Sequence, residues 1–240
     1  MMDSAGHQPG RFRKACYQQW LKVELFIQHI CVLGICAVLL GAFWIQFAQG
    51  EYPCPLCLLQ RMAMVMAAVG SIFIITHRHH ERINGFSVIG LGYGMSILSA
   101  VLGAIISTRQ VLLHIEPGEQ GYGAPVFGLH LYTWALIVFL FVILVSGIML
   151  IFGSDAASHK KTDTQEKTDN ISNRTLSRLP WYSACTFWIF GSIILVNAAS
   201  AFAEAGINLF LPDNPTSYRL FDEDQDRTKH EVTPPPETTE

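Results

Sequence analysis

Two cysteines three positions apart are the clearest chemical feature of this 240-residue chain. In the stretch "EYPCPLCLLQRMAM", Cys54 and Cys57 stand between a proline-marked turn and an apolar run, and Arg61 follows four residues later. Sulfurs at this spacing can close and reopen a disulfide, bind a metal, or form an inert structural clip. The residue types alone leave the three interpretations open.

Spacing separates these interpretations. A metal site usually needs four ligands, and no second C-x-x-C occurs in the sequence, so we expect no metal. Haem attachment requires histidine directly after the second cysteine, where this chain has Leu58. A disulfide that closes so short a loop restricts the unfolded chain little. The pattern therefore favours redox exchange, and a structural disulfide remains the alternative.

The surroundings of the pair suit exchange chemistry. An apolar run predicts a helix from about Leu58, whose N-terminal dipole would favour a thiolate at Cys57. Thiolates are the species that exchange with disulfides. Arg61 would lie one turn beyond Cys57 on the same side. It could donate to a quinone carbonyl or stabilise the thiolate, or it could extend to the membrane surface.

The composition indicates a membrane protein. Half of the residues are hydrophobic, 15% are charged, and the mean hydropathy is +0.32. A bilayer core about 30 Å thick needs roughly 20 apolar residues per helix. Five stretches meet this length: 25–47, 58–76, 86–106, 131–152 and 183–211. We therefore predict an all-α membrane protein, a four-helix transmembrane bundle plus a fifth C-terminal transmembrane helix. A net charge of −3 excludes a nucleic-acid partner.

Positive charge predicts the orientation of these helices. Lys and Arg number four in 1–24, two in 77–85 and five in 153–180. The loops 48–57 and 107–130 carry Arg109 alone. Because cytoplasmic loops are enriched in Lys and Arg, the N-terminus should be cytoplasmic and the Cys54–Cys57 pair should face the opposite side.

The same pattern divides the chain into five parts. They are a cytoplasmic arm 1–24, the bundle 25–152, a polar cytoplasmic linker 153–180, the fifth helix 181–211, and an acidic disordered tail 212–240. We expect the first four helices to form the working unit. On the fifth helix, four polar residues at spacings of three and four share one face: Asn197, Ser200, Glu204 and Asn208. A carboxylate inside a membrane segment is costly, so Glu204 either sits at the outer interface or, as we favour, packs against the bundle or a partner helix.

The run "PCPLCLLQR", at the outer start of a second membrane helix, resembles the bacterial DsbB family of disulfide-generating membrane proteins. "STRQVLLH" at 107–114 is also similar to the outer end of that family's third helix, and the resemblance covers about 20–152. It implies an inner-membrane oxidoreductase that passes electrons from a periplasmic thioredoxin-fold thiol oxidase to ubiquinone or menaquinone. It also implies that Cys54 and Cys57 are the quinone-proximal pair and that Arg61 helps to hold the quinone.

The chain departs from that family in one respect. The family normally carries a second cysteine pair between its third and fourth helices, but the segment 107–130 has no cysteine. The remaining cysteines are expected away from the outer face, as packing thiols: Cys16, Cys31, Cys36 and Cys185. The electron donor is therefore either a DsbA-like protein that attacks Cys54–Cys57 directly or a separate relay protein.

His114 and His130 flank the cysteine-free segment. They could line the quinone pocket or relay protons, because histidine titrates near neutral pH. They could equally be hydrogen-bonded residues at helix ends. Two further hypotheses stand beside the quinone-linked oxidase. One is a haem-carrying bundle with these histidines as ligands, and the other is a non-enzymatic assembly factor or transporter with a structural disulfide.

Overall fold

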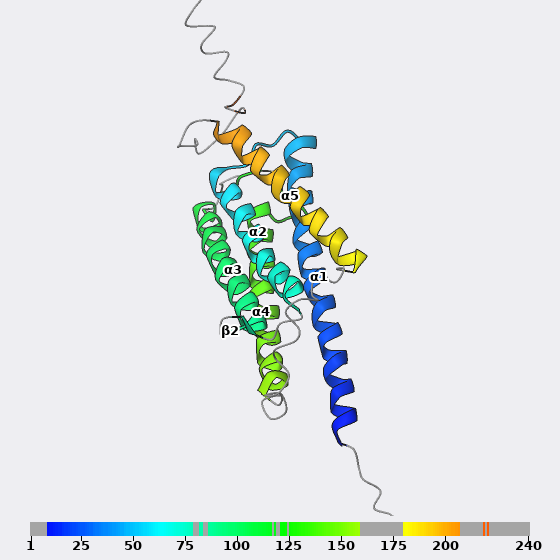
Figure 1. The fold of residues 1–240 in the computed structure, drawn as a ribbon. Helices are drawn as coiled ribbons and strands as arrows, with labels where there is room; N and C mark the ends of the chain where they lie inside the picture. Colours follow the sequence, from blue (N-terminus) through cyan, green and yellow to red (C-terminus); the bar gives the residue numbers. More distant parts are fainter. Residues whose placement is uncertain are drawn as a thin grey trace, which may run out of the picture.

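The computed structural model describes residues 9–78, 82–83, 86–116, 118, 121–123, 125–158, 180–206, 218 and 220. Within them the chain forms helices α1 (Pro9–Ala48), α2 (Pro55–Thr76), α3 (Val88–Leu113), α4 (Leu131–Ser158) and α5 (Trp181–Ala205) (Figure 1). A short antiparallel hairpin, β1 (Arg82–Ile83) and β2 (Phe86–Ser87), precedes α3. Each helix contains a stretch long and apolar enough to cross a membrane. This confirms the predicted all-α membrane fold with a fifth C-terminal helix.

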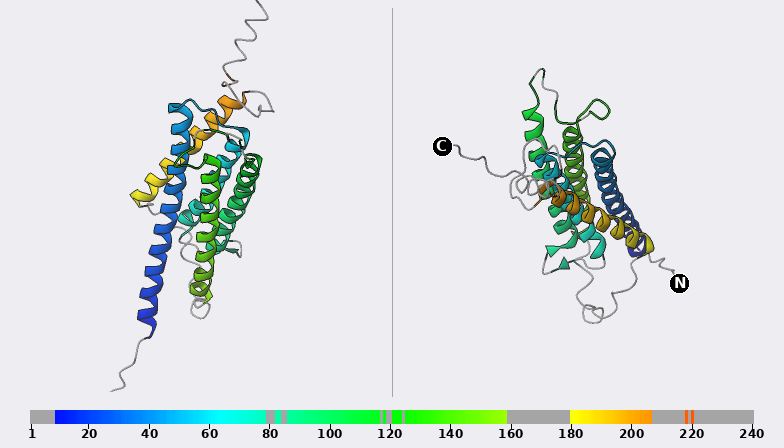
Figure 2. Two further views of the ribbon diagram at one scale, coloured as in Figure 1. Left: turned by 180° about the vertical axis from the view of Figure 1, so that it is seen from behind. Right: turned by 90° about the horizontal axis from the view of Figure 1, so that it is seen from above.

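The helices pack in a simple order. α2 packs against α3, α3 against α4, and α1 against α2. α5 lies diagonally across α1 and also contacts α2 (Figure 1), and the further views in Figure 2 show the same diagonal crossing. Side chains such as Leu39, Ala67 and Phe139 are buried between the helices, whereas Leu98 and Trp188 are largely exposed. The exposed apolar surface is the part that a bilayer would cover.

Small residues let α2 and α3 approach closely. A Cβ added at Gly70 would overlap the carbonyl oxygen of Gly92, and Ser96 donates a hydrogen bond to the carbonyl of Ala67 at 2.8 Å. Glycine and serine at such an interface allow two membrane helices to pack backbone against backbone. This close approach lies toward the C-terminal end of α2 and the N-terminal end of α3.

Two polar contacts fix α5 on α1. His29 Nε2 and Ser183 Oγ are 2.9 Å apart, and Gln46 Nε2 donates to Ser200 Oγ at 2.9 Å. Each pair is separated by 154 residues in sequence, so the two helices run in the same direction. Hydrogen bonds between membrane helices contribute about 0.6 kcal/mol each on average. Their main effect here is to fix the register.

The helix ends correct the boundaries that we predicted near the site. α2 begins at Pro55, not Leu58, because proline is well suited to the first helical position and Cys54 caps the helix. α3 continues to Leu113 and not only to 106. Its last two turns look polar in sequence, but they bury Ser107 and Gln110.

Two other boundaries also differ from the prediction. α1 begins at Pro9, so that the part of the predicted arm from Pro9 onward is helical. α4 runs to Ser158, into the predicted linker. The linker from 159 to 179, the predicted helix end at 207–211, and the tail apart from 218 and 220 lie outside the described residues.

Candidate redox site

Cys54 and Cys57 lie side by side at the N-terminus of α2. Their sulfurs are 2.6 Å apart, and Cys54 Sγ also accepts the backbone N–H of Cys57 at 3.2 Å. Cys54 is the N-cap residue and is only 5% exposed, whereas Cys57 is partly exposed. The hydrogen bond to Cys57, together with burial, raises the pKa of the Cys54 thiol. The two sulfurs therefore have different environments, and Cys54 is the one that keeps its proton.

Gln110 of α3 joins this pair. Its Nε2 lies 3.1 Å from Cys54 Sγ and 3.5 Å from Cys57 Sγ, and its Oε1 accepts a hydrogen bond from Gln60 at 2.8 Å. The side chain is 1% exposed. An N–H donor favours the charged form of a sulfur that it contacts. We did not predict Gln110, although its spacing of three from Ser107 indicates a shared helix face.

Arg61 is packed against α1. Its Nη1 donates to Gln46 Oε1 at 2.6 Å, its Nη2 donates to the carbonyl of Ala42 at 3.3 Å, and its Cζ lies 5.1 Å from the centre of the Phe43 ring. Only 7% of the residue is exposed. The guanidinium thus occupies a fixed position inside the bundle and does not extend to the membrane surface.

α5 reaches the same place through Gln46. Ser200 Oγ lies 3.1 Å from the Gln46 oxygen that Arg61 also contacts. Glu204, one turn further along α5, is 1% exposed, which confirms that it packs into the bundle. Among the described residues its carboxylate oxygens have no hydrogen-bond partner.

A cavity of about 450 Å³ adjoins Cys57 and Arg61. Its apolar wall comes mainly from α1 and α4, and polar groups gather around the N-terminal part of α2. The polar lining consists of Gln46, Glu51, Cys57, Gln60, Arg61 and Tyr122. A mostly apolar cavity of this size with a few polar groups is typical of a small-molecule site.

The segment after α3 closes over the cavity. Tyr122 lines it and donates a hydrogen bond to the backbone carbonyl of Tyr52. Burial raises the pKa of the Tyr122 phenol, which keeps it a donor at neutral pH. Gly123, with a φ of +76°, packs against Glu51, where an added Cβ would lie 2.9 Å from the carboxylate. The loop is therefore held by contacts to the residues just before the cysteine pair.

The two predicted histidines lie behind the cavity wall. His114 and His130 place their rings 5.7 and 5.3 Å from that of Tyr132, which lines the cavity, whereas neither histidine does. His130 Nδ1 is also 3.1 Å from the carbonyl of Gly123. The structure thus brings Cys54, Cys57 and Arg61 together and places the histidines as supports of the wall. In the part of the chain that is described, no cluster of three metal-binding side chains occurs.

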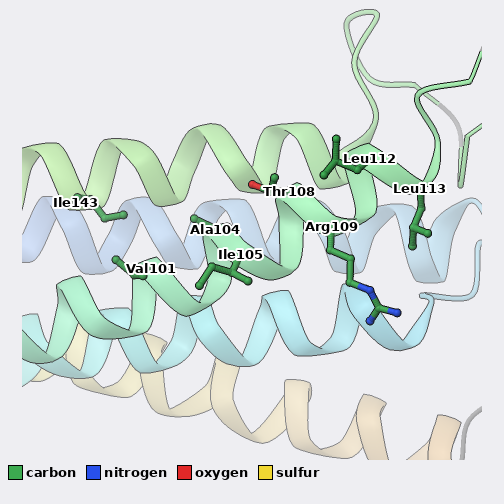
Figure 3. A pocket seen from close by; sticks show the side chains of 8 residues that line it. All are labelled: Val101, Ala104, Ile105, Thr108, Arg109, Leu112, Leu113 and Ile143. Carbon is green, nitrogen blue, oxygen red and sulfur yellow. The ribbon is translucent and has the colours of Figure 1, made fainter.

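Arg109 points elsewhere although it precedes Gln110. It lies on the exposed side of α3, in a shallow apolar groove of about 590 Å³ formed with Ile143 of α4 (Figure 3). The other cysteines with described side chains are also apart from the pair in sequence, Cys31 and Cys36 within α1 and Cys185 near the start of α5. The side chain of Cys16 lies outside the described residues.

Comparisons with known proteins agree with this site. Residues 25–124 match the family model "Disulfide bond formation protein DsbB". The chain is 37% identical over 92 residues to "Disulfide bond formation protein B" of Chromobacterium violaceum, which covers 38% of this chain and 52% of that protein. It is 34% identical over 95 residues to the protein of the same description from Hahella chejuensis, covering 39% and 54%.

A longer alignment is with "Disulfide bond formation protein B 1" of Pseudomonas fluorescens, 27% identical over 150 residues and covering 85% of that protein. The chain spans about half the length of the first two relatives. No solved structure matches. The family match includes both cysteines, Arg61 and Gln110, and it ends before α4 and α5.

Proposed function

We propose that this multi-pass membrane protein is a member of the DsbB family, whose model matches residues 25–124, and that it is a quinone-dependent thiol-disulfide oxidoreductase that supports disulfide bond formation. It would reside in the bacterial inner membrane, with Cys54 and Cys57 on the periplasmic side. The observation that carries the proposal is the shared cavity: Cys57 and Arg61 both line it, and Gln110 contacts both sulfurs.

The cavity fits a quinone, either ubiquinone or menaquinone. Its apolar wall suits a flat ring, and Arg61 offers a cation beside Cys57. Two of the N–H groups of Arg61 are donated to Gln46 and Ala42, and a guanidinium has five, so donors remain for a carbonyl oxygen. A quinone bound there would supply the acceptor for two electrons and two protons.

The cysteines would carry those electrons from a partner dithiol. A partner thiolate attacks the sulfur of Cys54 and breaks the Cys54–Cys57 bond, which leaves the electron pair on Cys57. The positive charge of Arg61 acts on Cys57 and Gln110 donates to it, so both favour this thiolate. The partner's second thiolate then breaks the mixed disulfide, so that the partner is oxidised and Cys54 and Cys57 are both reduced. The protons of these two thiols are the two protons that the acceptor would take up.

We propose a periplasmic thioredoxin-fold protein, DsbA-like or a relay, as the electron donor. Cys54 is only 5% exposed, so attack requires the partner to displace covering groups. One contact next to Cys54 in sequence is the hydrogen bond from the Tyr122 hydroxyl to the backbone carbonyl of Tyr52. Partner docking would therefore have to open the segment 51–53 or the loop at 121–123.

Quinone reduction by the purified full chain tests the proposal. Reduced thioredoxin-fold donors are supplied in turn, with ubiquinone and menaquinone analogues, and the loss of quinone absorbance is followed. We expect turnover by the wild type and a loss of at least about a hundredfold in Cys57→Ser, because a single thiol cannot form the intramolecular disulfide. Equal rates for the two proteins with every donor would contradict the proposal and leave Cys54–Cys57 as a structural disulfide.

A further inference from the structure

One face of α5 is polar and buried, although most of the helix is apolar. Its large side chains, such as Trp188 and Leu195, are exposed where a bilayer would lie. The buried polar residues occur at helical spacing on the side that packs against the bundle: Ser183, Thr186, Asn197, Ser200 and Glu204. Polar groups inside a membrane are costly unless they have a role, so this face needs an explanation.

Ser200 connects this face to the candidate redox site. Its hydroxyl accepts a hydrogen bond from Gln46 Nε2 at 2.9 Å and lies 3.1 Å from Gln46 Oε1. Ser200 therefore contacts both ends of the Gln46 amide, whose Nε2 also donates to the Tyr218 hydroxyl at 3.3 Å. The Oε1 of this amide accepts a hydrogen bond from Arg61 at 2.6 Å. The orientation of one amide thus links α5 to the guanidinium beside Cys57.

The position of Ser200 is itself fixed at a distance. His29 and Ser183 are hydrogen-bonded 17 residues before Gln46 and Ser200 on each helix. At about 1.5 Å per residue, the two contacts are roughly 25 Å apart along the helices. Two contacts at such a separation prevent α5 from sliding or rotating on α1, so Ser200 presents its hydroxyl at a constant place.

Glu204 lies on the same buried face of α5, one turn beyond Ser200, and is 1% exposed. Its carboxylate oxygens have no hydrogen-bond partner among the described residues. The contact of this face with the redox site therefore runs through Ser200.

We propose that α5 is a positioning element of the redox site, in which Ser200 orients Gln46 and Gln46 holds Arg61 beside Cys57. The effect on quinone use rests on the proposed function, whereas the effect on Cys57 does not. The four helices that we expected to form the working unit are then insufficient. The fifth helix sets the position of the arginine that the cavity depends on.

Alkylation of Cys57 tests this positioning without any quinone. The full chain is reduced, and the rate at which Cys57 reacts with a maleimide is followed by mass spectrometry. We expect Ser200→Ala to slow the reaction about fivefold, corresponding to the roughly 1 kcal/mol of one hydrogen bond. Arg61→Ala should slow it at least as much, because the cation that favours the thiolate is then absent.

Two matched variants separate positioning from general loss of packing. Ser200→Thr keeps the hydroxyl and should restore the rate. Ser192→Ala removes an exposed serine on the same helix, whose hydroxyl donates to the carbonyl of Trp188, and should leave the rate unchanged. If Ser200→Ala reacts as fast as Ser192→Ala, the proposal is wrong.

The quinone assay then links the position of Arg61 to turnover. We expect Ser200→Ala to raise the apparent KM for a ubiquinone analogue about fivefold with little change in kcat, and Ser200→Thr to recover it. The double variant Gln46→Ala, Ser200→Ala should be no worse than Gln46→Ala alone, because the serine acts through the glutamine. If the effects of the two substitutions on KM add, Ser200 does not act through Gln46 and the proposal is wrong. If the wild type reduces no quinone, the proposed function fails, and the alkylation rates still decide the role of α5.

Discussion

The side-chain amide of Gln110 lies 3.1 Å from the sulfur of Cys54, although 56 residues separate them in sequence. The contact joins the C-terminal end of α3 to the start of α2. The cysteine pair is therefore not an isolated motif, since its polar environment is supplied by another helix.

Removal of this amide should alter the redox behaviour of the pair. We expect Gln110→Leu to make the dithiol about tenfold easier to oxidise, because the donor that stabilises the thiolate of the reduced pair is lost. The equilibrium of the pair with glutathione measures the change. Arg109→Ala, at the neighbouring exposed position, is the control and should keep the wild-type equilibrium. An unchanged equilibrium in Gln110→Leu would show that the contact has no redox role.

Substitution of Arg61 should affect quinone use in a graded way. Arg61→Ala should raise the apparent KM for quinone, and Arg61→Lys should recover only part of the loss. A lysine cannot donate in two fixed directions as the guanidinium does to Gln46 and Ala42. Steady-state kinetics on membranes with equal amounts of each variant provide the measurement. A normal KM in Arg61→Ala would remove the arginine from the site.

The attacked sulfur can be identified by trapping. In Cys57→Ser, the lone thiolate of Cys54 attacks the disulfide of the oxidised partner, and the partner's other sulfur leaves as a thiolate. No neighbouring cysteine of this chain can displace the partner, so a mixed disulfide should accumulate. Non-reducing gels should show a species that reductant removes, and Cys54→Ser should yield much less of it. A trap that forms mainly in Cys54→Ser would show that the more exposed Cys57 is the attacked sulfur. A partner attached to Cys16, Cys31, Cys36 or Cys185 would contradict the proposed route.

The packing of α2 on α3 predicts a difference between two glycines. Gly70→Ala should destabilise the protein by about 1–3 kcal/mol, because the added Cβ would overlap the backbone of Gly92. Gly94→Ala has no atom within 4 Å of its Cβ and should be neutral or slightly stabilising. Unfolding in detergent, followed by circular dichroism, measures both. Equal stability of the two variants would contradict the close approach.

Much of this arrangement follows from the sequence. Long apolar runs predict the five helices. The asymmetry of Lys and Arg supports the orientation that we propose for the pair. Helical spacing places Arg61 one turn beyond Cys57, and the cost of a charge in lipid favours a packed position for Glu204. These are local properties of the chain, which is why they could be predicted.

The partners across helices could not be predicted in the same way. Membrane helices are apolar all round, so periodicity does not reveal which face meets which neighbour. The contacts of Gln110 with the cysteines and of Gln46 with Ser200 depend on the tilt and rotation of whole helices. The third apolar run predicts a helix that ends at 106. The polar residues beyond it give no sign that Gln110 is buried against Gln60 and Cys54.

Anaerobic oxidation of the reduced protein by quinone tests the central claim most directly, because it needs no partner protein. The full chain is reduced, freed of reductant, and mixed with one equivalent of ubiquinone analogue. We predict that one quinol forms for each Cys54–Cys57 disulfide, counted by absorbance and by thiol labelling, and that Cys57→Ser forms no quinol. Thiols that stay free while the quinone stays oxidised would contradict the account.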